Sequence, residues 1–462
     1  MDAGSTRVLA LEIDTAINSL VRGKLAPTVG GLFALPQVEL RTAEARSYLA
    51  AHAERFDAIL AMHTISNAAG ATGAMSLAES YLLTVEAMQL LLARLSDDGV
   101  LIVSRPETQI GRLCATSAAA WPYAGDVRRH VAVLSEAGDV PAFFTVMVVT
   151  RRPLDGAALA MVRAHAPRVL YLPDGGGDAQ DFFAAALSRD VAAARRVPLA
   201  YLPAQLEPAT DNAPFFNLHR PWSALAVADF AAVLGAGQAA RSRLEDLPVA
   251  QVAVVLVLVE LLALALLFVL PPYRALKKRG AEGAARAAGY FAALGFAFMT
   301  LEVVLMQMLT RIVGEPAWSM VATLSVLLMA SGLGSLFLAG RLAWSPQRSA
   351  LCAAGAALVV AWLAPRLVDA AAAWRFAGRL VVVVAVVLPV GLALGAPFAA
   401  GLRRLGRSDL VAWAWALNAL ASVAGSLGAL VLASSVGFAW TAGACAAAYL
   451  GSAALGRRLG RA

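Results

Sequence analysis

The sequence is poor in charged residues and in cysteine. Only 15% of its 462 residues are charged and 60% are hydrophobic, whereas an ordinary soluble domain is about 25% charged. The three cysteines, Cys114, Cys352 and Cys445, form no CxxC pair, which excludes a disulfide scaffold and a cysteine zinc site. No basic segment followed by an apolar one opens the chain, so no signal peptide is predicted.

Acidic residues are especially scarce in the second half. Residues 247–462 contain 17 Lys or Arg and only 6 Asp or Glu, whereas residues 1–246 contain 21 and 25. A mildly acidic half is thus joined to an apolar, basic half, which excludes a wholly soluble enzyme and a disordered chain. The basic residues flank apolar runs instead of forming one soluble patch, so no nucleic-acid partner is expected.

Long apolar runs fill the second half. Because a helix needs about 20 apolar residues to cross the hydrocarbon core, we expect an all-α domain of six or seven transmembrane helices in a lipid bilayer. The runs cover residues 249–270, 288–309, 317–339, 349–364, 380–400, 411–433 and 436–455. The fourth run is short, and Pro271-Pro272 is expected to close the first.

The number of Lys and Arg residues in the loops indicates on which side of the membrane the N-terminal half lies. With seven helices, the opposite side collects 13 Lys or Arg and the N-terminal side 6, and the positive-inside rule then favours a location outside the cytoplasm. With six helices the counts are 9 and 10, which show no bias. Because no signal peptide is predicted, we expect the N-terminal half in the cytoplasm and the helices in a bacterial inner membrane.

Four polar side chains interrupt the apolar runs: Glu260, Glu302, Gln307 and Asn418. A carboxyl group within a membrane is costly and often marks function, although a hydrogen bond that fixes helix packing is the alternative. The small residues at 331–335 and 391–395 are expected to let helices approach closely.

The first half alternates between apolar strands and helices. Strands are predicted at 8–13, 38–40, 56–62 and 100–103, and a helix at 76–95 with Ser76 and Glu79 as a capping box. Such alternation predicts a parallel α/β sheet with helices on both faces. Further strands are expected at 142–149 and 168–172, and the glycine run at 174–178 has little resemblance to a phosphate loop.

Ligands of parallel sheets bind at the carboxyl ends of strands. Glu12 stands at one such end and could accept hydrogen bonds from both hydroxyls of a ribose, or serve only at a helix start. His63 follows another strand end, and the five histidines have no metal-ligand spacing. No metal is expected.

Several segments resemble the spermidine synthase family. Residues 8–14 (VLALEID) and 38–49 (VELRTAEARSYL) resemble two of its strands with their acids. The resemblance implies a Rossmann-like fold of the S-adenosylmethionine methyltransferase type over residues 1–230. It also implies that Glu12, Asp14 and Glu44 bind the nucleoside, while Glu79 and Tyr81 line the amine side.

A closer resemblance is to bacterial multi-pass membrane proteins with a spermidine synthase-like domain. Residues 208–216 (PATDNAPFF) and 290–302 are similar to their signatures. A linker at 231–246, the membrane domain at 247–456 and a basic tail at 457–462 complete the expected organisation.

Two family features are missing. The opening strand, which lies at the centre of the family's sheet, and its GxGxG turn have no counterpart, and Ile65 stands where the catalytic Asp is expected. His63 could act as the base instead, because histidine titrates near neutral pH.

Three interpretations follow. The first is a membrane-anchored transferase of polyamine biosynthesis that uses decarboxylated S-adenosylmethionine, or S-adenosylmethionine, to modify a small polyamine-like amine. The second is a catalytically degenerate transport or sensing protein related to polyamines, and the third is a truncated product without function. A homo-oligomer is compatible with each.

Overall fold

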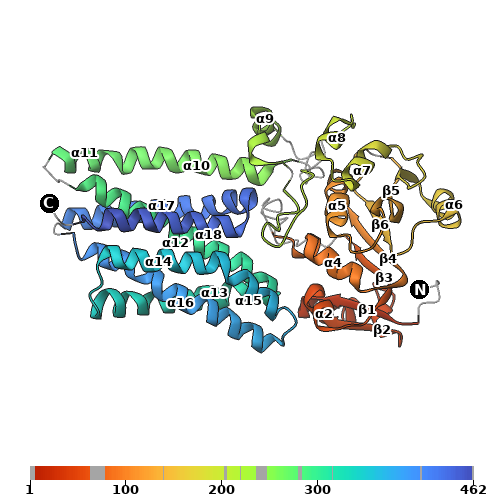
Figure 1. Ribbon diagram of the computed structural model, residues 1–462, viewed down its shortest axis with the longest axis horizontal. Coiled ribbons are helices and arrows are strands. Elements are labelled where there is room, and N and C mark those ends of the chain that lie inside the picture. The colour runs from red at the N-terminus through yellow and green to blue at the C-terminus, as the bar shows by residue number, and fades with distance from the viewer. Residues whose placement is uncertain are drawn as a thin grey trace.

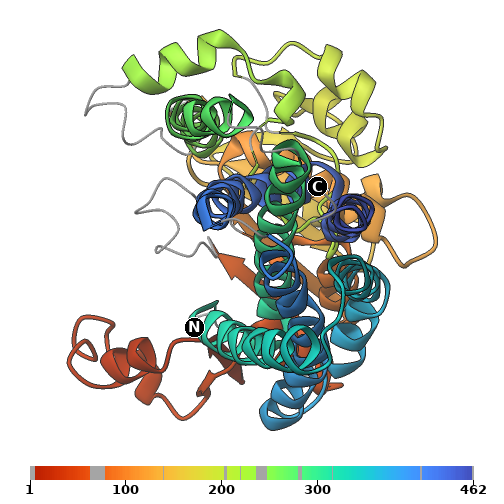
Figure 2. The same ribbon diagram turned by 90° about the vertical axis from the view of Figure 1, so that its left-hand side faces the viewer.

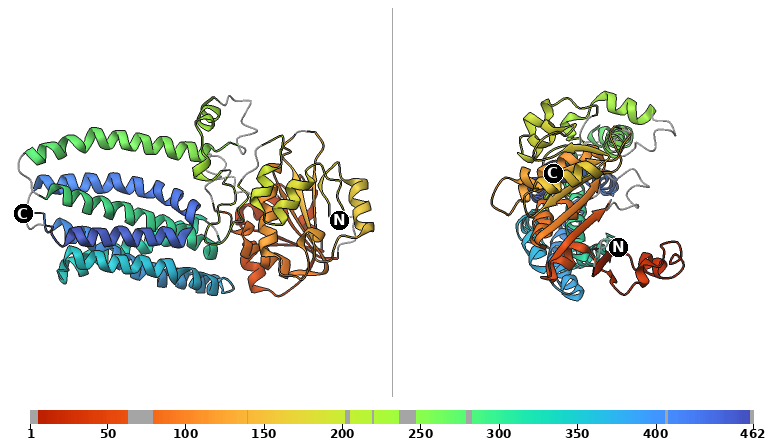
Figure 3. Two further views of the ribbon diagram at one scale, coloured as in Figure 1. Left: turned by 45° about the horizontal axis from the view of Figure 1, so that its top comes forward. Right: turned by 90° about the vertical axis from the view of Figure 1, so that its right-hand side faces the viewer.

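The computed structural model describes residues 6–62, 79–138, 140–201, 205–218, 220–235, 247–278, 283–314, 316–405 and 408–459. An α/β domain and a helical domain lie end to end along the longest axis (Figure 1). The left panel of Figure 3 shows the same arrangement, and the right panel views the molecule along this axis from the side of the α/β domain. We call the end of the helical domain that contacts the α/β domain the near end, and the opposite one the far end.

Seven described strands build two sheets in the α/β domain. They are β1 (Val8–Glu12), β2 (Val38–Thr42), β3 (Phe56–Met62), β4 (Leu95–Arg105), β5 (Val131–Ser135), β6 (Thr145–Thr150) and β7 (Arg168–Tyr171). One sheet is the parallel pair β1-β2, and the other has the order β3-β4-β6-β5-β7. Only β3 and β4 run parallel in the second sheet, so the wholly parallel sheet expected from the sequence is corrected to a mixed one.

The strand β5 explains this correction. It pairs antiparallel with both β6 and β7, and four of its five residues are buried. A strand that is covered on both faces lacks the alternation of polar and apolar residues that marks a half-buried strand, so the sequence does not predict it.

Side-chain contacts link the two sheets at the start of their strands. Among the described residues, β1 forms a ladder only with β2, and β3 only with β4. Arg7, just before β1, donates to Glu54, just before β3, at 2.9 Å and to Glu39 of β2 at 3.0 Å. Figure 2 shows the red β1 to β2 segment to one side of the orange β3.

Helices flank these sheets. They are α1 (Thr15–Arg22), α2 (Ala45–Ala51), α4 (Val85–Ala93), α5 (Glu107–Ala120), α6 (Gly156–His165), α7 (Gln180–Leu187) and α8 (Val191–Arg196). Helix α9 (Val227–Gly235) lies instead against the helical domain (Figure 1). The helix expected from Ser76 begins only at Val85. Thr84 is its N-cap and accepts from the amide of Ala87 at 3.2 Å, while Ser76 lies outside the described residues and Glu79 precedes the helix.

The helical domain is built from long apolar helices. They are α10 (Val249–Phe268), α11 (Leu270–Lys278), α12 (Ala284–Val313), α13 (Pro316–Gly334), α14 (Pro346–Trp362), α15 (Ala364–Ala371), α16 (Phe376–Leu402), α17 (Ser408–Val436) and α18 (Phe438–Gly456), with a π-helical segment, Ser335–Arg341, after α13. Six described helices are long and apolar enough to cross a membrane, which indicates a membrane protein.

The short fourth run forms a bent pair. Helices α14 and α15 meet at 42° and together have the length and composition of a seventh span. The pair runs the full length of the domain, because Pro346 packs near Gly456 at the far end and Asp369 contacts Arg311 at the near end.

The first span does not end at its two prolines. The helical path continues from Val249 to Ala275, since Pro271 and Pro272 lie in the first turn of α11. Amides of a first turn have no partner within the helix, so proline is tolerated there.

Small residues allow α13 and α16 to touch, as the sequence predicted. A Cβ added to Gly395 would lie 1.8 Å from the carbonyl oxygen of Ser331, and one added to Gly334 would lie 2.0 Å from that of Leu392. Backbones this close exclude any side chain at either glycine.

Candidate functional site

The segment 208–216 joins the two domains. The guanidinium group of Arg112, which is buried on α5, donates to the carbonyl oxygens of Phe215 and Phe216 at 2.7 Å each and to that of Glu207 at 2.8 Å. Burial lowers the pKa of Arg112 to about 9. These three bonds fix the segment against the α/β core and present the residues between them to the helices.

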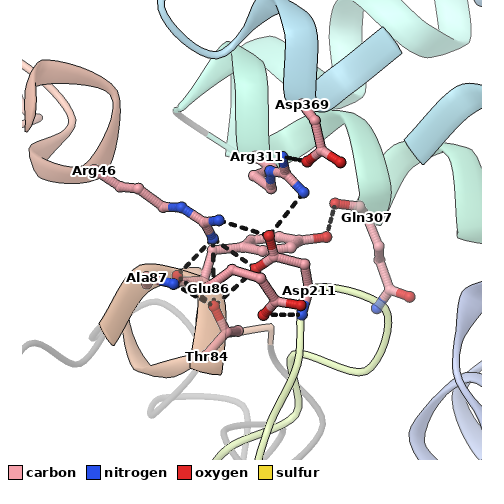
Figure 4. Close-up of polar contacts among 9 residues, drawn as sticks. Arg46, Thr84, Glu86, Ala87, Asp211, Gln307, Arg311 and Asp369 are labelled. Carbon is pink, nitrogen blue, oxygen red and sulfur yellow. Dashed lines mark hydrogen bonds and ion pairs between the residues drawn. The ribbon is translucent and has the colours of Figure 1, made fainter. Parts of the chain in front are cut away.

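Asp211 is the centre of a buried ionic network (Figure 4). Its two carboxylate oxygens accept from Arg46 of α2 at 2.6 and 2.5 Å. One of them lies 2.9 Å from Arg311 of α12, and the other accepts from the hydroxyl of Thr84 at 2.7 Å. Arg311 also pairs with Asp369 of α15. One carboxylate therefore binds an arginine of each domain.

The charged groups in this network shift one another's pKa values. Burial alone would raise the pKa of Asp211, but the hydrogen bonds and charge of Arg46, followed by the charge of Arg311, outweigh burial and lower it. Burial likewise lowers the pKa of Arg46, but its bonds with Asp211 reverse that effect and raise it. Both side chains are thus held in their ionised forms.

The neighbouring residue Asn212 caps a membrane helix. Its carbonyl oxygen accepts from the amide of Phe438 at 2.8 Å, and its side-chain oxygen accepts from the amide of Ala439 at 2.9 Å. Because the first amides of a helix have no partner within it, the α/β domain completes the start of α18.

A cavity of about 170 Å³ lies beside the network. Its lining combines polar and apolar groups from both domains: Tyr81, Glu86, Asp211, Asn212, Met308, Arg311, Pro365, Val368, Asp369 and Phe438. Since an engineered cavity of about 150 Å³ can hold benzene, this one has room for a small organic molecule.

Glu86 has no cationic partner among the described residues. Its carboxylate accepts from the backbone amide of Asp211 at 2.9 Å. Burial, and then the charge of Asp211, raise the pKa of Glu86.

The structure brings the predicted amine-side residues Glu79 and Tyr81 together with Gln307, which was predicted separately as a polar residue within a membrane span. The hydroxyl of Tyr81 donates to the backbone carbonyl of Gln307 at 2.9 Å, and the side-chain amide of Gln307 lies 3.5 Å from the carboxylate of Glu79. Burial raises the pKa of Glu79, and burial together with the charge of Glu79 raises that of Tyr81. The predicted amine side therefore faces the near end of α12.

The three acids predicted to bind a nucleoside lie at the ends of β1 and β2, Glu12 as the last residue of β1 and Asp14 and Glu44 just beyond the strands, and each bonds to a backbone amide. Glu12 accepts from the amide of Asp14 at 2.9 Å, and Asp14 caps α1 through the amide of Ala16 at 2.7 Å. Glu44 caps α2 with both oxygens, which accept from Arg46 and Ser47 at 2.9 and 2.7 Å.

These strand ends face the membrane helices. Gly314 follows α12 with a positive φ, and a Cβ there would lie 3.2 Å from Glu44 and 3.7 Å from Ile13. The carboxyl edge of the β1-β2 sheet thus meets the turn between α12 and α13.

The remaining predicted residues lie apart from this site. His63 lies outside the described residues. Glu302 is buried in α12, Glu260 is exposed on the outer side of α10, and Asn418 packs against Gly295. Among the described residues, no group of His, Cys, Asp and Glu could hold a metal ion.

Sequence reasoning missed the residues that join the domains: Arg46, Asp211, Arg311 and Asp369. Asp211 was noticed only within a resembling motif. Arg311, a lone cation at the end of an apolar run, is the one signal that could have indicated a buried carboxylate partner.

No protein-family model matches the chain, and no curated protein sequence matches it.

Proposed function

We propose that this chain is a membrane-anchored transferase of the spermidine synthase type, and that its junction cavity binds a small polyamine-like amine. The observation that carries the proposal is a pair of buried carboxylates, Glu86 in the cavity wall and Glu79 beside Gln307. Neither carboxylate forms an ion pair among the described residues. Buried carboxylates of this kind favour a cation.

The charge balance of the network supports the same ligand. Three carboxylates, Glu86, Asp211 and Asp369, meet two guanidinium groups, those of Arg46 and Arg311. With Glu79 added, the negative excess is two charges. A diamine in its doubly protonated form would balance it.

The nucleoside side of the proposal depends on Glu12. Its second carboxylate oxygen has no hydrogen-bond partner among the described residues, so it can still accept from a ribose hydroxyl of decarboxylated S-adenosylmethionine or S-adenosylmethionine. Glu44 fits less well, because both of its oxygens already accept from backbone amides.

The reaction would need little covalent chemistry from the protein. One ammonium group of the diamine first loses a proton to a carboxylate. The neutral amine nitrogen then attacks the carbon beside the sulfonium, and the carbon–sulfur bond breaks with its electrons going to sulfur, which leaves a secondary ammonium ion. Glu79 is the described carboxylate best suited to accept the first proton, because burial raises its pKa and makes it a stronger base.

The test is calorimetric titration of the full chain in detergent with putrescine, followed by a transfer assay with decarboxylated S-adenosylmethionine. Glu86→Gln keeps the oxygen that accepts from the amide of Asp211 but removes the charge, so putrescine should bind roughly 10-fold to 100-fold more weakly. The matched control is Glu207→Gln, an exposed acid paired with Arg195, which should bind normally. Absence of putrescine binding by the folded parent protein would refute the proposal.

A transport or sensing protein is the second candidate. The buried network connects α2 with α12 and α15, so an amine bound there would act on helices of both domains. With the pair α14 and α15 as a seventh span, the far side carries 13 Lys or Arg and the near side 6. The positive-inside rule then favours an α/β domain outside the cytoplasm, away from the sulfonium nucleosides made there.

Sidedness therefore separates the two candidates. Asp98→Cys puts a thiol on the exposed β4 segment, where the Asp98 side chain is 69% exposed. A membrane-impermeant maleimide should label it only after permeabilisation of spheroplasts if the transferase proposal holds. Labelling in intact spheroplasts would reject the transferase and support the sensing protein.

A further inference from the structure

Two polar side chains are buried within the apolar interior of the helical domain. Glu302 of α12 is 7% exposed, and Thr323 of α13 is fully buried. Neither the carboxyl group of Glu302 nor the hydroxyl of Thr323 has a hydrogen-bond or ionic partner among the described residues. A buried polar group without a partner is costly, so the two require a common explanation.

The register of the two helices places these residues at one level. The hydroxyl of Ser319 on α13 donates to the carbonyl oxygen of Met306 on α12 at 3.2 Å. Because only residues 314 and 315 separate the helices, α12 and α13 run antiparallel. Glu302 lies one turn before Met306, and Thr323 lies one turn after Ser319. Residues four apart share a helix face, so Glu302 and Thr323 lie at the same level of the two helices, one turn beyond this hydrogen bond.

Glu302 and Thr323 lie deep within the membrane-spanning part of the helical domain. At about 1.5 Å per residue, Glu302 is about 27 Å from the start of α12 and about 17 Å from its end at Val313. A hydrocarbon core about 30 Å thick would enclose Glu302 at any position of the 30-residue helix α12 along the membrane normal.

The surroundings contain no counter-charge. Helices α13, α15, α16, α17 and α18 pack against α12, and Glu302 forms no ion pair with any described residue of them. Asp369 of α15 pairs with Arg311, and the thiol of Cys445 is buried on α18. The nearest arginines, Arg311 and Arg379, lie at the near end, where Arg311 pairs with acids and Arg379 donates to backbone carbonyls.

We propose that Glu302 and Thr323 form a proton-binding site inside the membrane domain. A neutral carboxylic acid offers one O–H donor, and a threonine hydroxyl has lone pairs to accept it. Protonated Glu302 then donates to Thr323, which satisfies both groups and avoids an ionised carboxylate in hydrocarbon. The inference rests on α12 and α13 and is independent of the proposed transferase.

Polar groups lead from this site toward the near end. The hydroxyl of Ser319 lies one turn away, and the side-chain oxygen of Gln307 is buried without a partner. Gln307 then meets Glu79 of the α/β domain at 3.5 Å. These groups, together with water, give the proton a polar route to the junction side.

Infrared spectroscopy of the full chain in lipid vesicles tests the site. We expect a protonated-carboxyl C=O band at pH 7 that Glu302→Gln removes and that Glu260→Gln, the matched change on α10, leaves in place. Thr323→Val should move the frequency of this band, because its hydrogen bond is lost. Thr441→Val, which removes a buried hydroxyl bonded only within α18, should not move it.

Several outcomes would overturn the proposal. No protonated-carboxyl band at pH 7, a band that survives Glu302→Gln, or a band that Thr323→Val leaves at its frequency would each do so. A normal gel-filtration profile and helical circular dichroism of each variant ensure that the spectra report on folded protein.

Discussion

Replacing Asp211 with asparagine removes the charge that binds the two domains together. The side chains of Arg46, Asp211 and Arg311 are 13%, 11% and 9% exposed, so the two arginines would stay buried with their shared carboxylate gone. Breaking a buried pair by removing one partner costs about 3–5 kcal/mol. For a domain of 150–250 residues, such a loss lowers the melting temperature by roughly 6–20 °C.

The pH dependence of stability adds a second signature. Because the folded-state pKa of Asp211 is lowered, its contribution is fully present above the unfolded value of about 3.9. It is lost as the pH falls through the folded value. The stability difference between parent and Asp211→Asn should thus be constant near neutrality and shrink in acid.

Scanning fluorimetry of both proteins in detergent, between about pH 2 and pH 8, measures these effects. The matched control is Asp174→Asn, which breaks an ion pair with Arg163 whose side chains are 42% and 45% exposed. Exposed pairs contribute about 0–1 kcal/mol, so the control should melt within a few degrees of the parent. Equal melting temperatures for the two variants would refute the reasoning.

Three further changes test packing and capping. Gly395→Val should prevent α13 and α16 from packing together, because the valine side chain would overlap the carbonyl oxygen of Ser331. This variant should lose the monodisperse gel-filtration peak of the parent protein. The control variant Gly443→Val should keep that peak, because open space surrounds Gly443. Asn212→Ala should cost about 1 kcal/mol and speed hydrogen exchange in the first turn of α18, and unchanged exchange would contradict the capping role. Arg112→Met should cost about 3 kcal/mol or more by leaving buried carbonyls without donors, visible as a lower melting temperature, and a melting temperature equal to the parent's would argue against it.

Local pattern predicted much of the fold. The strand at 56–62 has its predicted bounds, and each predicted apolar run overlaps a described helix or helix pair, although the first helical path continues past Leu270 to Ala275. By contrast, α5 and β5 are buried on nearly all sides, so neither shows the alternation of a half-exposed element. The missed elements are those with no polar face.

The candidate site was predicted only in part. Glu79, Tyr81 and Gln307 were each selected, but nothing in one sequence joins residues 228 positions apart. The Arg46–Asp211 pair spans 165 positions and depends on how the domains meet. The acids at the ends of β1 and β2 were located correctly, while their bonds to backbone amides depend on local turns.

The missing ladder between β1 and β3 divides the α/β domain into two units of unequal cooperativity. Hydrogen bonds within the larger sheet must break together, whereas the β1-β2 unit is attached through Arg7 and through packing of Leu9 and Leu11. Such units open at separate free energies, and the amides of β1 and β2 should exchange with solvent before those of β4 and β6. A nucleoside held by Glu12 would slow the opening of the β1-β2 unit first. Binding at this edge would therefore be measured as slower amide hydrogen exchange in the first 45 residues.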